Sequence, residues 1–107
     1  MKKMEIASSE NLGHGHLACA GCGAGVGMRL TLKALWEKTV MVFPASCCSI
    51  VPGFWPYSSL RITAIHAGFV TGGATASGIR AALDIRGDRD TLVAVWAGDG
   101  GTFDIGL

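Results

Sequence analysis

Arg61-Ile-Thr-Ala-Ile-His66 and Thr91-Leu-Val-Ala-Val-Trp96 are two short runs of strand-forming residues. Residues 72–86 lie between them, begin with a crowd of small side chains and stop before Gly87, which is the pattern of a helix. A strand, a helix and a second strand in this order predict a βαβ unit, in which the two strands form a parallel pair joined by a right-handed crossover. The stretch therefore predicts an α/β fold with a mostly parallel sheet and flanking helices.

The preceding residues predict one more helix and one more strand. Apolar residues recur at helical spacing over residues 24–38, where Met28, Leu32, Leu35 and Trp36 form one stripe. The continuous apolar run 39–43, closed by Pro44, predicts a strand buried on both faces. We expect a loop at residues 45–49, and an aromatic loop at 50–60 that serves as a lid or packing surface.

The composition of the chain argues against several classes of function. Half of the 107 residues are hydrophobic and the net charge is +1, with no basic patch for nucleic acid. No apolar run is long enough to span a membrane, and the first ten residues lack the apolar segment of a secretory signal, so we expect a cytoplasmic protein. Residues 1–12 are predicted to be a polar lead-in. Because the chain stops where a helix begins, we expect residues 13–107 to be the first part of a longer domain.

Three thiols form the first candidate site. Cys19 and Cys22 are separated by two small residues, and Cys47 follows one helix and one strand later. Converging thiolates suit an iron–sulfur cluster or zinc. A structural zinc knuckle, a redox dithiol and a zinc site completed by a histidine from Gly13-His-Gly-His16 remain alternatives at this point.

Ala97-Gly-Asp-Gly-Gly-Thr102 forms the second candidate site. It follows the strand at 91–97, and in open α/β sheets ligands bind beyond the carboxyl ends of the strands. The Asp99 carboxylate is available to a magnesium ion there, and the neighbouring glycines let the backbone approach a phosphate closely. An ordinary Asp-Gly turn is the alternative.

Taken together, Gly-His-Leu-Ala-Cys-Ala-Gly-Cys-Gly, Pro44-Ala-Ser-Cys47 and the run 97–106 resemble the β subunit of pyruvate:ferredoxin oxidoreductase, a 2-oxoacid:ferredoxin oxidoreductase. The resemblance covers about residues 13–107. It implies a thiamine-diphosphate-binding fold and oxidative decarboxylation of pyruvate to acetyl-CoA and carbon dioxide. Electrons would pass through [4Fe-4S] clusters to ferredoxin or flavodoxin, and the implied partners are the other subunits of a hetero-oligomer, pyruvate and coenzyme A.

The resemblance also implies roles for single residues. Cys19, Cys22 and Cys47 become ligands of the [4Fe-4S] cluster, and Cys47 also lies against thiamine diphosphate. Gly98, Asp99, Gly100 and Gly101 become the diphosphate turn, with Asp99 as the magnesium ligand. His66, near a strand end, is a candidate to reach the substrate, and a packed structural histidine is its alternative.

Two departures from the family pattern matter. The fourth cluster cysteine and the asparagine-containing second half of the diphosphate motif are absent from this sequence. Cys48 is an additional thiol that could replace Cys47 as a ligand, although the spacing from Cys22 favours Cys47. Two other functions stay open: the same chemistry on another 2-oxo acid, and a non-catalytic zinc or iron–sulfur module that docks to partners.

Overall fold

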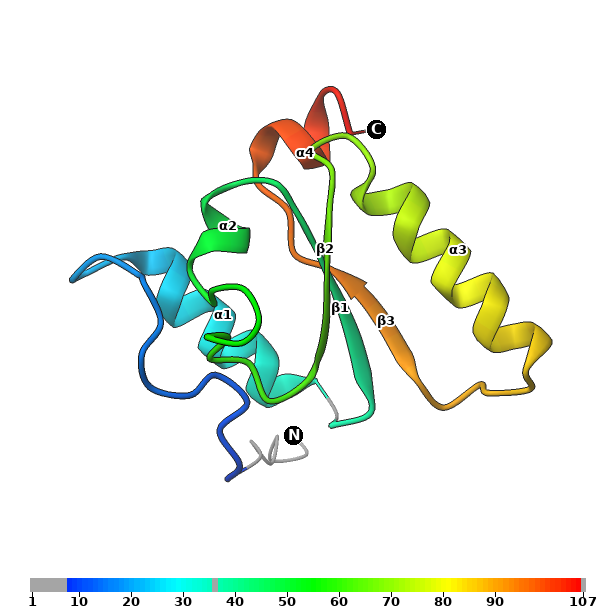
Figure 1. The fold of residues 1–107 in the computed structure, drawn as a ribbon, viewed down its shortest axis with the longest axis horizontal. Coiled ribbons are helices and arrows are strands. Elements are labelled where there is room, and N and C mark those ends of the chain that lie inside the picture. The colour runs from blue at the N-terminus through cyan, green and yellow to red at the C-terminus, as the bar shows by residue number, and fades with distance from the viewer. Residues whose placement is uncertain (1–7, 36, 107) are drawn as a thin grey trace, which may run out of the picture.

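The computed structural model describes residues 8–35 and 37–106, which form three strands and four helices (Figure 1). Their order along the chain is α1 (Gly23–Ala34), β1 (Thr39–Pro44), α2 (Cys47–Ile50), β2 (Thr63–Ala67), α3 (Gly72–Ile85), β3 (Leu92–Val95) and α4 (Asp99–Phe103). The α/β class predicted from the sequence is confirmed. Among the described residues, no helix has the length and apolar character needed to cross a membrane.

The three strands form one parallel sheet with the order β2-β1-β3. The βαβ unit predicted from residues 61–97 is present, but its two strands are not neighbours, because β1 lies between them and pairs with both. Phe43 lies opposite His66 in β2, and Met41 lies opposite Ala94 in β3. The expectation of a directly paired β2 and β3 is therefore wrong. A crossover helix of 14 residues is long enough to pass over an intervening strand.

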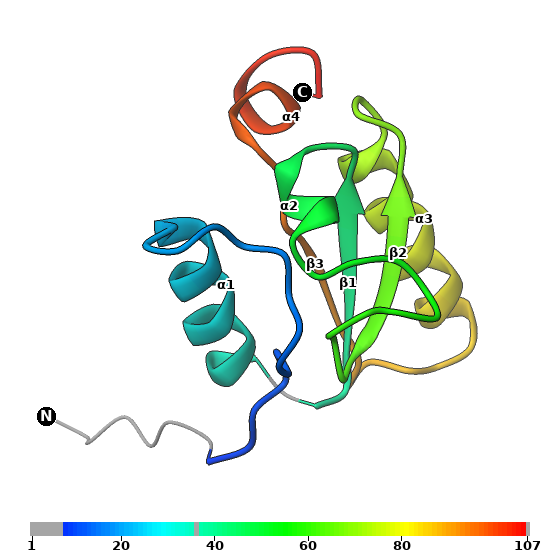
Figure 2. The same cartoon turned by 60° about the vertical axis from the view of Figure 1, so that its left-hand side comes forward.

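Helices cover both faces of the sheet. Figure 2 shows α1 and α2 on one side and α3 on the other. The core lies on the α1 side, where Met28 and Leu32 of the helix pack against Met41 and Phe43 of β1. Two buried residues outside these elements, Leu12 and Val51, complete this cluster. The apolar stripe predicted from Met28 and Leu32 is thus confirmed as core.

Two of the expected elements differ in extent or burial. The helix predicted over 24–38 ends at Ala34, because the backbone of Leu35 is extended, with φ −86° and ψ 149°. Trp36, placed in its apolar stripe, lies outside the described residues. The strand at 91–97 was expected to be buried, but Leu92 and Val95 of β3 are each 39% exposed. Among the described strands β3 has only β1 as a neighbour, so its side chains are incompletely covered.

The N-terminal segment contributes to the packing as well. Residues 1–7 of the predicted lead-in lie outside the described residues. Further along, Leu12 forms an isolated antiparallel bridge with Leu60, and the Asn11 side-chain amide donates a hydrogen bond to the carbonyl of Leu32. These contacts attach the segment to the core next to α1.

We predict opposite effects for two neighbouring alanine substitutions at the start of α3. A Cβ on Gly72 would lie 2.7 Å from Pro44 Cγ and 3.3 Å from Val95 Cγ1, so Gly72→Ala should overpack the buried contact between α3 and β1 and cost about 1–3 kcal/mol. A Cβ on Gly73 meets nothing within 4 Å, so Gly73→Ala should stabilise the helix by roughly 0.5–1 kcal/mol. Urea denaturation measures both. Equal midpoints for the two variants would contradict the close packing at Gly72.

Candidate functional site

The turns that follow β1 and β3 meet at the carboxyl edge of the sheet. Because the two strands are parallel neighbours, the Ser46–Cys47 turn and the Gly98–Asp99 turn leave the sheet at the same end. A Cβ placed on Gly98 would lie 3.7 Å from the Cβ of Ser46, which is ordinary van der Waals contact. The structure therefore brings the turns of the two candidate sites together, and the Cys47 and Asp99 side chains are both exposed there.

Residues 45–49, expected as a loop, contain the short helix α2. Ser46 is its N-cap: its hydroxyl oxygen accepts a hydrogen bond from the Cys48 amide at 3.2 Å. The Ser46 amide in turn donates to Ser49 Oγ at 3.3 Å, which completes a capping box. This local bonding makes the turn of helix favourable immediately after Pro44 and sets the direction in which Cys47 leaves the sheet.

The two adjacent cysteines of α2 have different environments. Cys47 is exposed, whereas Cys48 is only 8% exposed. Burial raises the pKa of the Cys48 thiol, so this thiol resists forming the thiolate that a metal requires. The preference for Cys47 over Cys48 as a ligand stays a prediction, and their difference in burial supports it.

Cys19 and Cys22 lie in the turn that leads into α1. The Cys22 amide donates a hydrogen bond to the Cys19 carbonyl at 3.0 Å, and Gly21 between them has φ +76°, which favours glycine. Cys22 is the N-cap of α1, so the helix begins at Gly23, one residue before the predicted range 24–38. The Leu17 amide donates to the Val51 carbonyl at 2.8 Å, which ties this segment to the end of α2.

The described residues do not bring all three predicted cysteines to one point. Cys19 and Cys22 line the same pocket, but Cys47 is not part of its lining. No group of three or more histidine, cysteine, aspartate or glutamate side chains among residues 8–35 and 37–106 is placed to hold a metal. The free thiols fit the chemistry of a soft metal or iron–sulfur cluster. Of the three predicted ligands, Cys19 and Cys22 lie in one pocket and Cys47 lies outside it.

The Asp99 turn fits a magnesium–diphosphate site in its donor chemistry. The carboxylate is exposed at the first residue of α4, and Gly98 has no close neighbour that would obstruct an approaching ligand. Gly100 has a second reason to be glycine, because a Cβ there would lie 2.8 Å from Phe69 Cζ. A side chain at Gly100 would require the ring of Phe69, which is 42% exposed, to move. Glycine at this position therefore gives no evidence by itself for a phosphate.

His66 is packed between two aromatic rings. Its ring centroid lies 5.8 Å from that of Phe43 and 4.4 Å from that of Phe54. Burial lowers the pKa of His66 below its usual 6.5, which favours the neutral ring at pH 7. Its buried Nδ1 has no hydrogen-bond partner among the described residues. The histidine is thus part of the packing beneath the aromatic loop, and its role toward a substrate stays a prediction.

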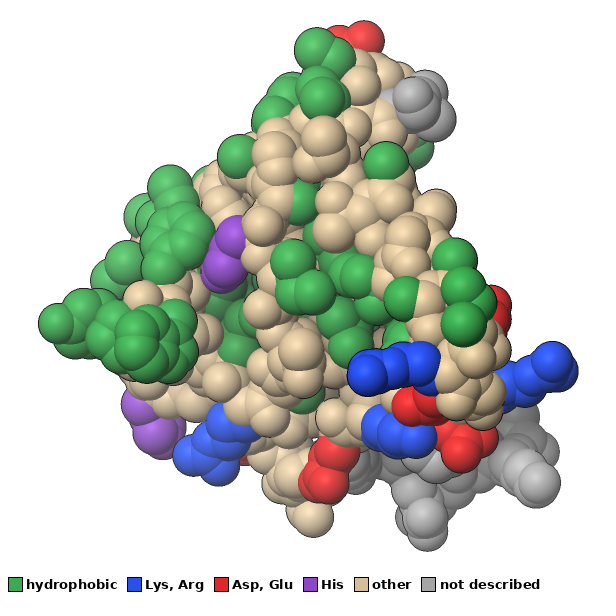
Figure 3. All heavy atoms as spheres, turned by 45° about the vertical axis from the view of Figure 1, so that its right-hand side comes forward, with side chains coloured by type: hydrophobic (Ala, Val, Ile, Leu, Met, Phe, Trp, Pro, Cys, Tyr) green, Lys and Arg blue, Asp and Glu red, His purple; other side chains and the backbone are tan. Residues whose placement is uncertain are grey.

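The aromatic loop is less buried than a packing role requires. Phe54 contacts His66, but Trp55 and Tyr57 are 88% and 86% exposed. Figure 3 shows hydrophobic side chains gathered at one flank of the molecule beside a histidine. A packing role explains the position of the Phe54 side chain, and it does not explain the exposed side chains of Trp55 and Tyr57.

Sequence reasoning missed two features near these sites. The capping role of Ser46 had a weak signal, since Ser46 and Ser49 have the spacing of a capping box without its usual acidic residue. The pocket beside Cys19 and Cys22 also contains Arg29 and Arg61, and nothing in the sequence indicates that these distant residues meet. Their proximity depends on how the N-terminal segment packs against α1.

Comparisons with known proteins agree with these motifs. No family model matches the chain. Ketoisovalerate oxidoreductase subunit VorB of Pyrococcus horikoshii is 48% identical over 111 residues, which cover 99% of this chain and 36% of the relative. Pyruvate synthase subunit PorB of Methanothermobacter thermautotrophicus is 46% identical over 104 residues, covering 97% and 36%. PorB of Pyrococcus furiosus is 36% identical over 117 residues, covering 100% and 35%.

The chain belongs to the VorB/PorB family of 2-oxoacid:ferredoxin oxidoreductase β subunits. It spans about a third of the length of these relatives. The family resemblance inferred from the cysteine and glycine motifs is confirmed. The relatives include both a ketoisovalerate enzyme and pyruvate enzymes, so their names leave the choice of 2-oxo acid open.

We predict that Ser46 stabilises the turn that carries Cys47. Ser46→Ala removes the cap of α2 and should lower the free energy of unfolding by about 1 kcal/mol. Ser46→Thr keeps a hydroxyl and should restore most of the loss. Ser77→Ala, at an exposed position of α3, is the matched control and should change the stability by less than about 0.5 kcal/mol. Denaturant unfolding compares the variants, and a Ser46→Ala protein as stable as the Ser77→Ala protein would refute the capping role.

Proposed function

We propose that this chain is the thiamine-diphosphate-binding part of a 2-oxo acid oxidoreductase that converts pyruvate to acetyl-CoA and carbon dioxide. The observation that carries the proposal is the contact between the Ser46–Cys47 turn and the Gly98–Asp99 turn at one edge of the sheet. A reaction that moves electrons from a cofactor to a cluster needs the two groups close together. Adjacent parallel strands provide that proximity through their own backbone geometry.

The proposed roles divide between the two turns. Asp99 would hold a magnesium ion that neutralises the diphosphate, and Gly98 would leave space for the diphosphate to approach the backbone. Cys19, Cys22 and Cys47 would hold a [4Fe-4S] cluster, with a fourth ligand from outside these residues. When bound, thiamine diphosphate supplies the electron sink for decarboxylation and the cluster accepts the electrons.

The cysteines must come closer than they lie in this structure for that role. Cys19 and Cys47 are both exposed and so can change rotamer without unpacking the core. The hydrogen bond from Leu17 to Val51 links the first cysteine segment to the end of α2, so the two segments that carry the cysteines lie next to each other. The buried Cys48 is less able to take part, because exposing it would disrupt the packing under α2.

The partners follow from the same proposal. The other subunits of a hetero-oligomer would supply the groups that bind pyruvate and position the cofactor. Coenzyme A would accept the acetyl group, and ferredoxin or flavodoxin would accept the electrons. The exposed Trp55 and Tyr57 are available to another subunit.

A branched 2-oxo acid is the second candidate substrate, because the VorB relative that is 48% identical is named for ketoisovalerate. The test measures reduction of a viologen dye by the complete enzyme with pyruvate, 2-oxoisovalerate and 2-oxoglutarate, each in the presence of coenzyme A. The proposal expects the highest kcat/KM with pyruvate. A preference for 2-oxoisovalerate would show that this acid, and not pyruvate, is the substrate, and the proposed type of reaction would be unchanged. Absence of dye reduction with every 2-oxo acid would favour a non-catalytic zinc or iron–sulfur docking module.

We predict different effects of substituting the two adjacent cysteines. After anaerobic reconstitution of the complete protein, Cys47→Ser should lose most of the iron, sulfide and broad visible absorbance of a [4Fe-4S] cluster. Cys48→Ser is the matched control and should keep them, since the Cys48 side chain is buried. The reverse result would show that Cys48 is the ligand. Stoichiometric zinc without iron in the freshly isolated protein would count against the cluster itself.

We predict that Asp99→Asn weakens magnesium-dependent binding of thiamine diphosphate on the order of 10- to 100-fold, because it keeps the size of the side chain and removes its charge. Calorimetry on the complete enzyme across a magnesium titration measures the affinity. Asp90→Asn, at an exposed aspartate between α3 and β3, is the control and should bind the cofactor as the unmodified enzyme does. An unchanged affinity in Asp99→Asn at every magnesium concentration would remove this turn from the cofactor site.

A further inference from the structure

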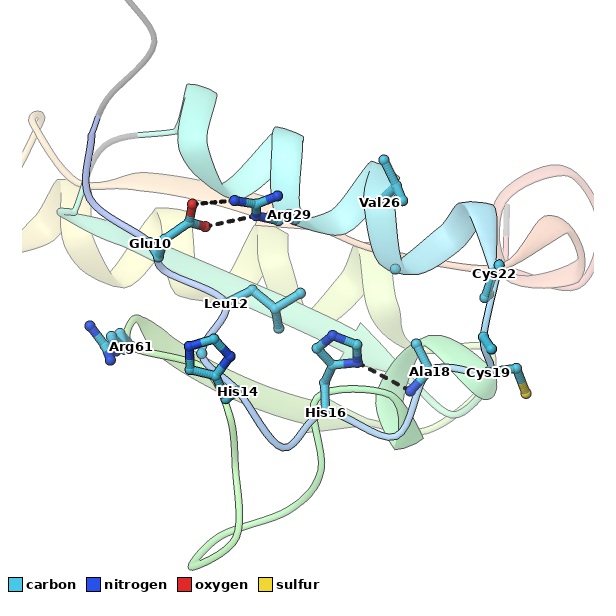
Figure 4. A pocket seen from close by; sticks show the side chains of 14 residues that line it. Glu10, Leu12, His14, His16, Ala18, Cys19, Cys22, Val26, Arg29 and Arg61 are labelled. Atoms are coloured by element: carbon cyan, nitrogen blue, oxygen red, sulfur yellow. Dashed lines mark hydrogen bonds and ion pairs between the residues drawn. The ribbon is translucent and has the colours of Figure 1, made fainter.

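A pocket separate from the Cys47 and Asp99 turns lies between the N-terminal segment and α1. Figure 4 shows it, with Glu10 and Arg29 on one side, His14 and Arg61 on another, and Leu12 between them. Its volume is about 610 Å³, which is in the range of small-molecule sites, and a lone inorganic ion would fill only a small part of it. Neither Cys47 nor the glycine turn at 98–101 contributes to its lining, whereas Cys19 and Cys22, two of the proposed cluster ligands, do.

The side chains around this pocket carry a net positive charge. Arg29 donates two hydrogen bonds to the Glu10 carboxylate, at 2.6 and 3.0 Å, and Lys33 contacts the same carboxylate at 2.7 Å. These bonds, led by that from Arg29, lower the pKa of Glu10 to about 2, so the carboxylate stays ionised and committed to its two cations. Two cations share one carboxylate, which leaves one positive charge in excess; Arg29 lines the pocket, whereas Lys33 lies outside its lining.

Arg61 adds a second positive charge. No acidic side chain among residues 8–35 and 37–106 forms an ion pair with its guanidinium, and Figure 4 shows Arg61 beside the imidazole of His14. The His16 ring accepts a hydrogen bond from the Ala18 amide through Nδ1, at 3.3 Å. While that bond holds, the proton of the neutral ring is on Nε2, which can donate to a ligand. The polar side chains that line the pocket therefore offer hydrogen-bond donors and positive charge to a ligand.

The pocket is held by backbone contacts and does not depend on a ligand for its shape. The Gly13 amide donates to the Ser59 carbonyl at 2.8 Å, and the Arg61 amide donates to the Asn11 carbonyl at 3.0 Å. On the α1 side, a Cβ on Gly25 would lie 3.1 Å from the Cβ of Ala18, so the cysteine segment packs tightly against the helix. Buried Leu12 gives the pocket an apolar floor.

We propose that this pocket binds the phosphate-bearing end of a nucleotide-sized ligand. Arginine recognises phosphate through two parallel hydrogen bonds, and Arg61 is the cation left free to do so. The imidazole rings and the floor formed by Leu12 suit the flat, partly apolar remainder of such a ligand. Coenzyme A carries phosphates on a nucleotide and is its natural source if the proposed function holds; a free nucleotide is the other source.

The test uses adenosine 3′,5′-bisphosphate, coenzyme A, pantetheine and inorganic phosphate as probes, titrated by calorimetry into the complete protein. We expect the bisphosphate and coenzyme A to bind and compete with each other, with pantetheine failing to displace the bisphosphate. Arg61→Ala should weaken binding of the bisphosphate about tenfold, and Arg61→Gln should do the same. The control is Arg89→Ala, at an exposed arginine between α3 and β3, which should leave the affinity unchanged.

Three results would overturn this proposal: no binding of the bisphosphate to the unmodified protein, unchanged affinity in both Arg61 variants, or an equal loss in Arg89→Ala. Binding of inorganic phosphate as tightly as the bisphosphate would refute the nucleotide-sized ligand. If the bisphosphate binds and coenzyme A does not, a free nucleotide is the ligand. The proposed function uses Cys19 and Cys22 of this pocket and does not use Arg61. Failure of bisphosphate binding would therefore leave the oxidoreductase proposal standing, and the dye-reduction assay tests that proposal separately.

Discussion

The parallel pairing of β1 with both of its neighbours is the constraint on which the rest of the structure depends. Because β2, β1 and β3 point the same way, the segments that follow all three strands leave from one edge of the sheet. The Ser46–Cys47 turn and the Gly98–Asp99 turn are about fifty residues apart in the chain, yet they lie close together there.

Packing at this edge depends on the absence of side chains at particular positions. Gly72 lets the start of α3 lie against the buried ring of Pro44 at the end of β1, and Gly100 leaves room for the ring of Phe69. A glycine next to a candidate ligand therefore does not by itself indicate a ligand. Gly98 and Gly101 differ, since a Cβ on either would lie no closer than 3.4 Å to a neighbour, which is ordinary contact distance.

The three thiols show when the spacing of cysteines in the sequence predicts their proximity in the structure. Two cysteines three residues apart share a turn, and their proximity follows from local geometry and the left-handed Gly21. Cys47 comes from a different element, so its distance from the pair depends on how α1 and α2 pack on the sheet. The described residues leave it apart from the pair, although the Leu17–Val51 hydrogen bond holds the two segments next to each other.

The sequence by itself determined the α/β class, the start of α1 to within one residue, the extent of β1 and the apolar stripe of Met28 and Leu32, because these follow from local periodicity and turn residues. It also determined the family, since the cysteine and glycine motifs are local. Only the tertiary structure decided that β1 separates β2 from β3, that Cys48 is buried while Cys47 is exposed, and that Arg61 faces Glu10 and Arg29 across a pocket. Each of these depends on contacts between residues distant in the chain, and the free energy of such contacts is set by packing that local sequence patterns do not encode.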